Sequence, residues 1–233
     1  MRRRRLGQHY LVDQDVVRKI VEAAAIQPHE RVLEIGTGQG ALTKKLVTAG
    51  KSFVGYEIDR RNYEETVQSV GGDVDIHLGD AFDHMPEFDV LVASLPYSRS
   101  ASFIDWLCQV DYKRAVVLLQ EEFVQKVQAR PGAREYRAVS VLAQISSEIR
   151  TLGRVGRASF SPPPKVNSSL VAITPKSRVP EEEILKIKRL FSLRRRQVSS
   201  ALAELRMIPR KEYGMRRVYS LVPDEVHQLC STT

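Results

Sequence analysis

The chain has little cysteine and no long apolar run. Its 233 residues contain two cysteines, Cys108 and Cys230, which lie far apart and match neither a zinc-ligand pattern nor a disulfide framework. We therefore expect two reduced packing residues and no metal site. No stretch of about 18 apolar residues is present, so the sequence predicts no membrane-spanning segment.

The first residues also lack the pattern of a secretory signal peptide. An arginine run leads directly into Gly7-Gln8-His9-Tyr10, without an apolar core or a small-residue cleavage site. We therefore expect a cytoplasmic protein with no membrane partner. We also expect a monomer.

Excess charge is absent from the middle of the chain and concentrated at its two ends. The formal net charge is +8. Arg2, Arg3, Arg4 and Arg5 supply four positive charges, and residues 176–233 contain 13 Lys or Arg against 7 Asp or Glu. A solvated surface is the ordinary explanation of such runs. Two basic ends around a near-neutral body also fit a polyanion, of which nucleic acid is the simplest.

Short apolar runs alternate with helical stretches along the first half of the chain. The pattern predicts a helix capped by Asp13, because its apolar positions recur every 3.6 residues. Strands are predicted at residues 31–35, 52–57, 74–80, 88–93 and 115–119. Such alternation is typical of a parallel, doubly wound sheet.

The composition changes after residue 175. Residues 1–175, with later strands at 144–153 and 168–175, are predicted to form the α/β domain. A helix then begins near Pro180 with three glutamates in its first turn, where the helix dipole favours negative charge. With further helices near 198–206 and 223–229, residues 176–233 are predicted to form a small basic helical subdomain.

A glycine turn follows the first strand of the predicted sheet, and a helix is predicted directly after it, at residues 41–47. Gly36, Gly38 and Gly40 allow a tight turn that a ligand can approach without meeting a Cβ atom. With Ala41 they also match the dinucleotide fingerprint, so these residues leave an NAD enzyme possible.

Acids at neighbouring strand ends favour S-adenosylmethionine as the cofactor. Glu34 precedes the glycine turn, and Glu57 and Asp80 end the next two strands. In this interpretation Glu57 accepts the ribose hydroxyls and Asp80 accepts the adenine amino group. Each acid taken alone could equally be a helix cap or a surface charge.

Ser94, Leu95, Pro96 and Tyr97 follow the apolar run at residues 88–93. Proline fixes its own φ and favours an extended residue before it, so backbone carbonyls here can accept hydrogen bonds from an amino group. Tyr97 offers a ring for stacking, and Ser94 offers a further acceptor. The alternative is a strand-to-helix turn with a packed tyrosine.

The motifs occur in the order of a known family. The chain resembles the small-subunit ribosomal RNA adenine N6,N6-dimethyltransferases, and the residues that carry the resemblance are Gly7–Leu11, Glu34–Gly40, Tyr56–Asp59, Gly79–Ala81, Leu95–Tyr97, Leu119–Glu122, Phe160–Ser168 and Arg194–Arg196. The match covers nearly the whole chain. It implies a Rossmann-like class I methyltransferase with a mostly parallel seven-stranded sheet, plus a small C-terminal helical subdomain.

The resemblance also implies roles for individual residues. The cofactor-binding residues would be His9, Leu11, Gly36, Gly38, Glu57, Asp80 and Ser94. The catalytic tetrapeptide would be Ser94, Leu95, Pro96 and Tyr97. Phe160 would stack on the target base opposite Tyr97, although a core aromatic before a turn is the alternative.

The chain departs from the family pattern in three places. Ser94 stands where the family has asparagine, Arg137-Ala138 stands where a glycine-arginine pair is usual, and the C-terminal subdomain is short. The first departure affects the catalytic tetrapeptide directly.

Three functions follow from this reading. The first is dimethylation of N6 of adjacent adenosines in a small-subunit ribosomal RNA hairpin, during ribosome biogenesis. In this function Arg2–Arg5 and the cluster Arg194, Arg195 and Arg196 would hold phosphates of the RNA. The second is an assembly factor that binds the RNA or the pre-ribosomal subunit with weak or no transferase activity. The third is an NAD oxidoreductase.

Overall fold

A computed structural model describes residues 9–71, 73–213 and 215–231, and its chain divides into two compact units. The first unit comprises the residues up to Phe103 together with Val110–Glu121 and Ile149–Pro175. The second comprises Ile104–Gln109, Glu122–Glu148 and the residues from Lys176 onward. The predicted domains, 1–175 and 176–233, stay a prediction, because compactness alone does not test which part folds independently.

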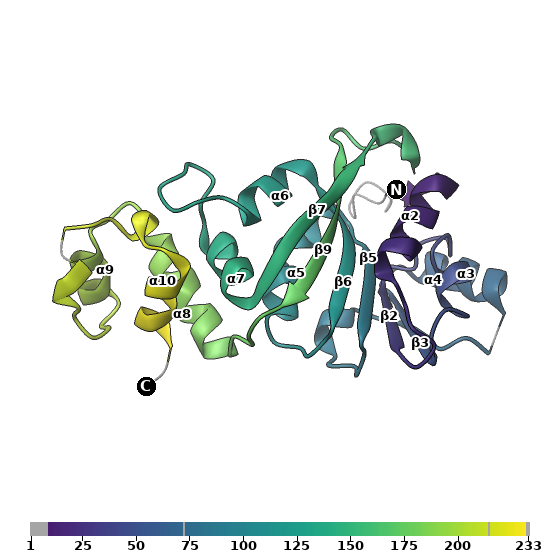
Figure 1. Ribbon diagram of the computed structural model, residues 1–233, viewed down its shortest axis with the longest axis horizontal. Coiled ribbons are helices and arrows are strands. Elements are labelled where there is room, and N and C mark those ends of the chain that lie inside the picture. The colour runs from purple at the N-terminus through teal and green to yellow at the C-terminus, as the bar shows by residue number, and fades with distance from the viewer. Residues whose placement is uncertain (1–8, 72, 214, 232–233) are drawn as a thin grey trace. The chain divides into compact units, whose positions relative to one another are not determined.

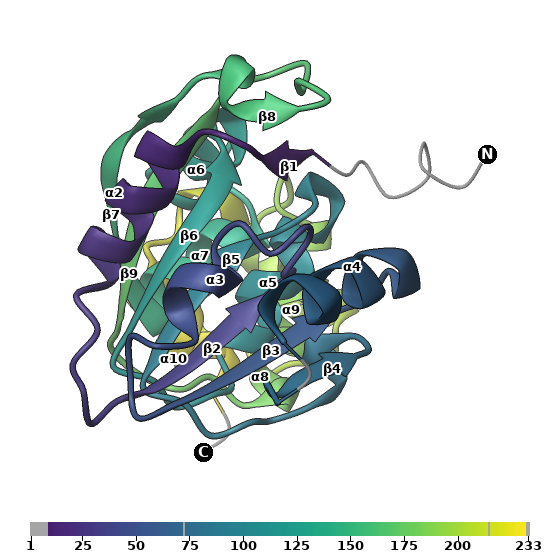
Figure 2. The same ribbon diagram turned by 90° about the vertical axis from the view of Figure 1, so that its right-hand side faces the viewer.

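One mixed sheet forms the framework of the first unit. Its seven strands lie in the order β4-β3-β2-β5-β6-β9-β7 (Figure 1, with β4 labelled in Figure 2). The bounds are β2 Arg31–Ile35, β3 Ser52–Glu57, β4 Ile76–Leu78, β5 Val90–Ser94, β6 Arg114–Gln120, β7 Ser147–Val155 and β9 Ser168–Pro175. The pairs from β4 across to β6 are parallel, whereas β9 is antiparallel to β6. The predicted mostly parallel seven-stranded sheet is confirmed.

The central strands are buried because helices cover the sheet. Val90, Leu91 and Val92 of β5 are wholly buried, and β6 is buried from Ala115 to Leu119. Continuous apolar runs are what a parallel strand covered on both faces requires. The core of the unit therefore runs along the middle of the sheet, and the polar strand ends are left for the ligand site.

Capped helices flank the sheet. The Asp13 carboxylate accepts hydrogen bonds from Asp15 N and Val16 N and begins α2 (Gln14–Ala24), which packs against β5, β6 and β9. Asp59 caps α4 (Arg60–Val70) in the same way, beside β3 and β4. The cap predicted at Asp13 is therefore confirmed. The remaining helical elements of this unit are α3 (Thr43–Leu46), η1 (Ala81–Asp83), η2 (Tyr97–Arg99), the start of α5 (Ser100–Leu107) and η3 (Arg157–Ser159).

A second, two-stranded sheet joins two distant parts of the first unit. Strand β1 (Tyr10–Leu11) pairs antiparallel with β8 (Phe160–Ser161), and Figure 2 shows the two side by side. Ser159 Oγ donates to the Asp13 carboxylate at 2.8 Å, which links the same segments again. The N-terminal segment is thereby held against the loop that carries Phe160.

The second unit is helical. Its helices are α6 (Glu121–Val127), α7 (Ala138–Ser146), α8 (Glu181–Ser192), α9 (Val198–Glu204) and α10 (Pro223–Cys230), with short η4 (Lys211–Tyr213) and η5 (Val218–Ser220). Helices α7, α8 and α10 pack together, and the buried Tyr136 hydroxyl donates to Leu221 O at 3.0 Å. The helices predicted after residue 180 are confirmed.

Two predicted boundaries are wrong. The helix expected after the glycine turn is a single turn, α3, since the residues before Thr43 form turns. The strand expected from residue 144 begins at Ser147, because α7 continues to Ser146. Both cysteines are buried and unbridged. Within the described residues, none of the helices combines the length and apolarity that a bilayer crossing requires.

Candidate active site

A cavity lies at the carboxyl ends of β2, β3 and β5 in the first unit. Parallel strands bring these ends to one edge of the sheet, which is where open α/β folds bind ligands. The described residues that line it include most of the predicted site, namely His9, Leu11, Glu34, Gly36, Gly38, Glu57, Asp80, Ser94, Leu95, Pro96, Tyr97 and Phe160.

The glycine turn is left-handed at all three glycines. Gly36, Gly38 and Gly40 have φ values of 81°, 57° and 78°, a region that disfavours other residues. A Cβ on Gly36 would lie 3.2 Å from Ser94 O. The turn therefore forms a bare backbone cradle against the catalytic tetrapeptide, and this fits a closely bound cofactor.

Glu57 ties the end of β3 to the glycine turn. Its carboxylate accepts Gly38 N at 2.8 Å and Asp59 N at 2.9 Å. Burial raises the pKa of Glu57, while these hydrogen bonds act in the opposite direction. Each oxygen keeps a further lone pair, so the residue can orient the turn and still accept ribose hydroxyls.

Glu34 lies beneath the cradle with unsatisfied polar atoms. Neither of its carboxyl oxygens makes a hydrogen bond of good geometry among the described residues, and the same holds for the hydroxyls of Thr37 and Thr43, although the Thr43 hydroxyl acts to lower the Glu34 pKa. Complete burial, followed by the charge of Glu57, raises the pKa of Glu34 to about 8. Buried polar atoms normally have partners, so this cluster fits a polar ligand or water at the cavity floor.

Asp80 begins η1 and also forms an ion pair. Its Oδ1 accepts Phe82 N at 3.1 Å, and its Oδ2 accepts a hydrogen bond from Arg99 Nη2. The carboxylate is thus a cap, as one reading of the sequence had it, and it also lines the cavity. Its remaining lone pairs can accept an amino group.

Ser94 ends β5 and Pro96 turns the chain away from the sheet. Ser94 pairs with Leu118 in the ladder, and Leu95 is buried. Pro96 has φ −55° and ψ 133°, as the sequence predicted, and precedes η2. Within the described part of the chain no hydrogen bond engages the Ser94 hydroxyl, which leaves it available as an acceptor.

The rings of Tyr97, His9 and Phe160 line the cavity at the tetrapeptide. Tyr97 Oη lies 2.8 Å from Ser168 Oγ of β9, and burial raises the Tyr97 pKa. The His9 ring centroid lies 5.7 Å from that of Tyr97, and its Nδ1 is 2.7 Å from Pro162 O. Phe160 lines the cavity and is also 96% buried in the core, so both readings of this residue describe part of its environment.

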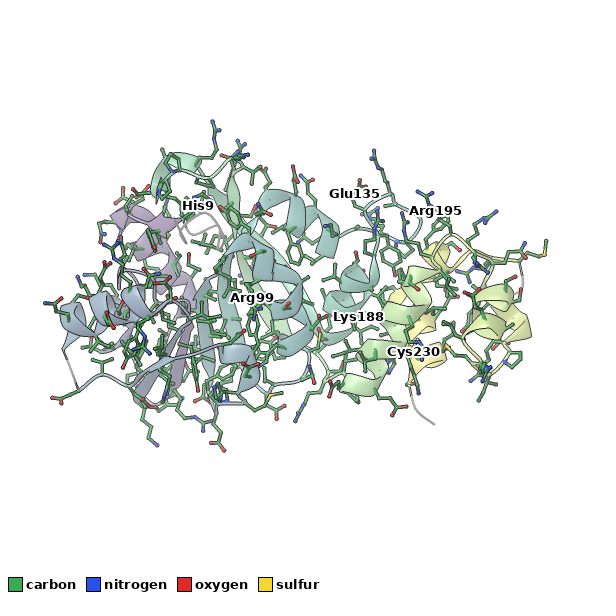
Figure 3. All side chains as sticks on the ribbon, turned by 180° about the vertical axis from the view of Figure 1, so that it is seen from behind. His9, Arg99, Glu135, Lys188, Arg195 and Cys230 are labelled. Atoms are coloured by element: carbon green, nitrogen blue, oxygen red, sulfur yellow. The ribbon has the colours of Figure 1, made fainter. Side chains whose placement is uncertain are left out.

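The predicted RNA-binding residues divide into two groups. Arg2, Arg3, Arg4 and Arg5 lie outside the described residues. Arg194, Arg195 and Arg196 follow α8 in the second unit, and Arg195 is labelled in Figure 3. Burial, then the charges of Arg137 and Arg195, lowers the pKa of Arg194. Arg137 therefore belongs to this cationic cluster.

Sequence reasoning missed two residues of the site. Ser168 was noted only within a motif, since no local pattern shows that β9 brings it to Tyr97. Arg99 was passed over although it stands two residues after Tyr97. A cation directly after a cavity motif was the available signal, but its partner Asp80 depends on the tertiary fold.

The sheet order, the cradle and the strand-end acids together define a class I, S-adenosylmethionine-dependent methyltransferase. The family model for ribosomal RNA adenine dimethylase matches residues 1–218. The chain belongs to that family and is an adenine methyltransferase of ribosomal RNA.

Individual relatives agree with the family assignment. The chain is 36% identical over 241 residues to a probable ribosomal RNA small subunit methyltransferase A of Pyrococcus abyssi, covering 97% of this chain and 89% of the relative. It is 33% identical to a probable dimethyladenosine transferase of Caenorhabditis elegans, covering 97% and 73%. A crystal structure of a dimethyladenosine transferase from Plasmodium falciparum is similar with a TM-score of 0.80 and 25% identity, covering 95% of this chain and 96% of the other.

Proposed function

We propose that this protein dimethylates N6 of adjacent adenosines in a hairpin of small-subunit ribosomal RNA. The family membership and the names of the Pyrococcus and Caenorhabditis relatives support the substrate class. The observation that carries the proposal is one cavity whose lining includes both the strand-end acids and the tetrapeptide Ser94 to Tyr97. One cavity can therefore hold the cofactor and a base together.

We assign the cofactor to the glycine side of the cavity. Gly36 and Gly38 supply the cradle, Glu57 would accept the ribose hydroxyls, and Asp80 would accept the adenine amino group. His9 and Leu11 belong to the segment held by β8 and would cover the cofactor. When bound, S-adenosylmethionine supplies an electrophilic methyl group on a positively charged sulfur.

The target base would lie on the tetrapeptide side. A base must leave its stack to enter such a pocket, and the rings of Tyr97 and Phe160 both line this cavity. The amino group of adenine is a weak nucleophile because its lone pair is delocalised into the ring. If the two N–H groups of this amine donate hydrogen bonds to Ser94 Oγ and to the Leu95 carbonyl, the lone pair becomes localised on nitrogen and points toward the methyl group.

Positioning accounts for most of this chemistry. Once the nitrogen carries the new methyl group it is positively charged, and the proton that it must lose is acidic. The tetrapeptide therefore needs no strong base. Fixing the reacting atoms in line can contribute roughly 7 to 11 kcal/mol. Ser94 is shorter than asparagine and offers one hydroxyl oxygen in place of an amide oxygen, which makes it the residue on which the rate depends.

RNA binding would combine the cationic cluster of the second unit with the N-terminal arginines. Neutralising phosphates with such residues makes affinity fall steeply with salt. We expect this binding at Arg137 and Arg194–Arg196, where burial and then the neighbouring positive charges lower the Arg194 pKa. The expectation of a cytoplasmic monomer stays a prediction.

The decisive experiment uses purified protein, unmethylated small subunits and radiolabelled S-adenosylmethionine. Digested RNA is examined for mono- and dimethyladenosine, with Ser94→Ala and Ser94→Asn beside the wild type. The exposed Ser102→Ala on α5 is the matched control, because it removes a hydroxyl close in sequence to the tetrapeptide from a residue that does not line the cavity. We expect label from wild type and Ser102→Ala and a loss of at least 10-fold in Ser94→Ala.

Three results would contradict the proposal. Tight RNA binding without transfer by the wild type, while Ser94→Asn is active, would identify an assembly factor whose serine has disabled the site. Transfer to large-subunit RNA alone would refute the proposed substrate. Nicotinamide binding with no RNA affinity would restore the oxidoreductase reading.

A further inference from the structure

Arg99 is a cation in a cavity that otherwise carries acids. Among the described residues that line the cavity it is the one Lys or Arg, beside Glu34, Glu57 and Asp80. A cation there would repel the positively charged sulfur of the cofactor, whereas the carboxylate of the cofactor would attract it. The partners of Arg99 therefore decide what this residue does; Figure 3 labels its position.

Three contacts fix Arg99 between two loops. Its Nη2 donates to Asp80 Oδ2, and its guanidinium lies over the Phe82 ring, 4.7 Å from the centroid. Its backbone N–H donates to Pro96 O at 2.8 Å, within the turn that carries Tyr97. Phe82 in turn lies 6.3 Å from Phe103, centroid to centroid. The side chain thus connects the tetrapeptide turn with the loop that follows β4.

These contacts leave Asp80 with one orientation. Phe82 N holds Oδ1 and Arg99 holds Oδ2, so rotation of the carboxylate would break a bond on one side or the other. The ion pair is partly shielded from water, with side-chain exposures of 37% for Arg99 and 23% for Asp80. Charge-assisted hydrogen bonds with a planar guanidinium give such geometric definition.

We propose that Arg99 is a positioning residue that makes the cofactor site selective for adenine. It holds the Asp80 carboxylate so that the remaining lone pairs face an exocyclic amino group and repel a carbonyl oxygen at the same position. The proposal rests on the adenine-binding role proposed for Asp80. It adds that the selectivity is set by a residue on the target-base side of the cavity.

The test measures binding and needs no RNA. S-adenosylhomocysteine is compared by titration calorimetry with S-inosylhomocysteine, in which an oxygen replaces the amino group of the base. Arg99→Met keeps the length of the side chain and removes its donors, whereas Arg99→Lys keeps the charge without the plane. Arg61→Met is the matched control, because Arg61 pairs with Glu65 at 2.7 Å on α4 and does not line the cavity.

We expect Arg99→Met to weaken the binding of S-adenosylhomocysteine about 5-fold and to reduce the preference for it over the inosyl analogue by a similar factor, as the loss of one hydrogen bond of ordinary net strength implies. The affinity and the preference of Arg99→Lys should lie between those of the wild type and Arg99→Met, and those of Arg61→Met should match the wild type. In an Asp80→Asn background, Arg99→Met should change the preference less than about 2-fold, because the bond it makes is already altered. Thermal unfolding identifies any variant that fails to fold, in which case Arg99→Gln replaces it.

Separate results overturn the two linked ideas. If Asp80→Asn leaves the preference unchanged, Asp80 does not recognise the adenine. If Asp80→Asn reduces the preference and Arg99→Met does not, the positioning role of Arg99 is wrong. Equal weakening of both ligands, undiminished in the Asp80→Asn background, would mean that Arg99 binds the cofactor elsewhere and would also overturn the proposal.

Discussion

Ser168→Ala tests whether the hydrogen bond to Tyr97 holds that ring for the target base. Ser168 is wholly buried on β9, and its Oγ lies 2.8 Å from Tyr97 Oη. The variant leaves the ring in place and removes the partner of a half-buried hydroxyl. We expect slower methylation with little change in cofactor affinity, because the bond lies on the base side of the cavity.

The expected size follows from the interaction removed. A neutral hydrogen bond contributes about 0.5 to 1.5 kcal/mol, which corresponds to a loss of roughly 2- to 12-fold in kcat/KM. Tyr97→Phe breaks the same bond and should give the same loss. The double variant should be no worse than either single variant, since only one interaction exists to be lost. Tyr97→Ala should lose a further 1 to 3 kcal/mol or so of base stacking.

Single-turnover methylation of unmethylated subunits measures these rates directly. Ser169→Ala is the matched control, because its side chain is also buried on β9 but points to the other face of the sheet. Losses that add in the double variant would show that Ser168 and Tyr97 act separately. A Ser169→Ala variant as slow as Ser168→Ala would mean that the strand, and not the hydrogen bond, is responsible.

Three further predictions concern the supports of the site. Glu34→Gln should be more stable than the wild type, by an amount that grows between pH 5 and pH 8 to on the order of 4 kcal/mol. The reason is that a folded-state pKa of about 8 keeps Glu34 neutral in the folded protein, so the wild type loses stability as the pH rises and the glutamine variant does not. Chemical unfolding across this range measures the difference, and a difference that does not depend on pH would contradict the prediction. Arg114→Met should lower the free energy of unfolding by about 3 kcal/mol at pH 7, because it removes the closer ion pair of the buried Glu30 carboxylate and leaves only Lys113, 3.7 Å away. The loss should shrink in acid, where that carboxylate is protonated. Gly36→Ala should weaken cofactor binding at least 10-fold in calorimetry. Its φ of 81° strains any residue with a side chain, and the added Cβ would lie only 3.2 Å from the Ser94 carbonyl oxygen. Unchanged affinity would refute the tight cradle.

Local patterns were sufficient to predict most of the framework. The strands at 31–35 and 52–57 have the predicted bounds, because a short buried parallel strand is a continuous apolar run with clear breaks on both sides. The cap at Asp13 has an equally local cause. The helix after the glycine turn was predicted too long, since its apolar residues serve the core equally well in turns as in a helix.

The site was predicted where one chain segment carries the signal and missed where two distant segments meet. The glycine turn and the tetrapeptide can each be recognised within a few residues. The pairing of Tyr97 with Ser168 spans 71 positions, and the pairing of Arg99 with Asp80 spans 19. No periodicity encodes such contacts, because they arise only when strand order places β9 beside β6 and η1 beside η2.

The contact between Gly36 and Ser94 bears on how serine can replace asparagine in this family. The Ser94 carbonyl is confined by the left-handed turn at Gly36, and the Leu95 side chain is buried, so the backbone of the tetrapeptide is held whatever side chain position 94 carries. One of the two proposed acceptors, the Leu95 carbonyl, belongs to that backbone. Substitution at position 94 therefore changes one acceptor and leaves the other in place. For this reason we expect Ser94→Ala to be slow without being inactive, and Ser94→Asn to keep the same cofactor affinity while its methylation rate changes.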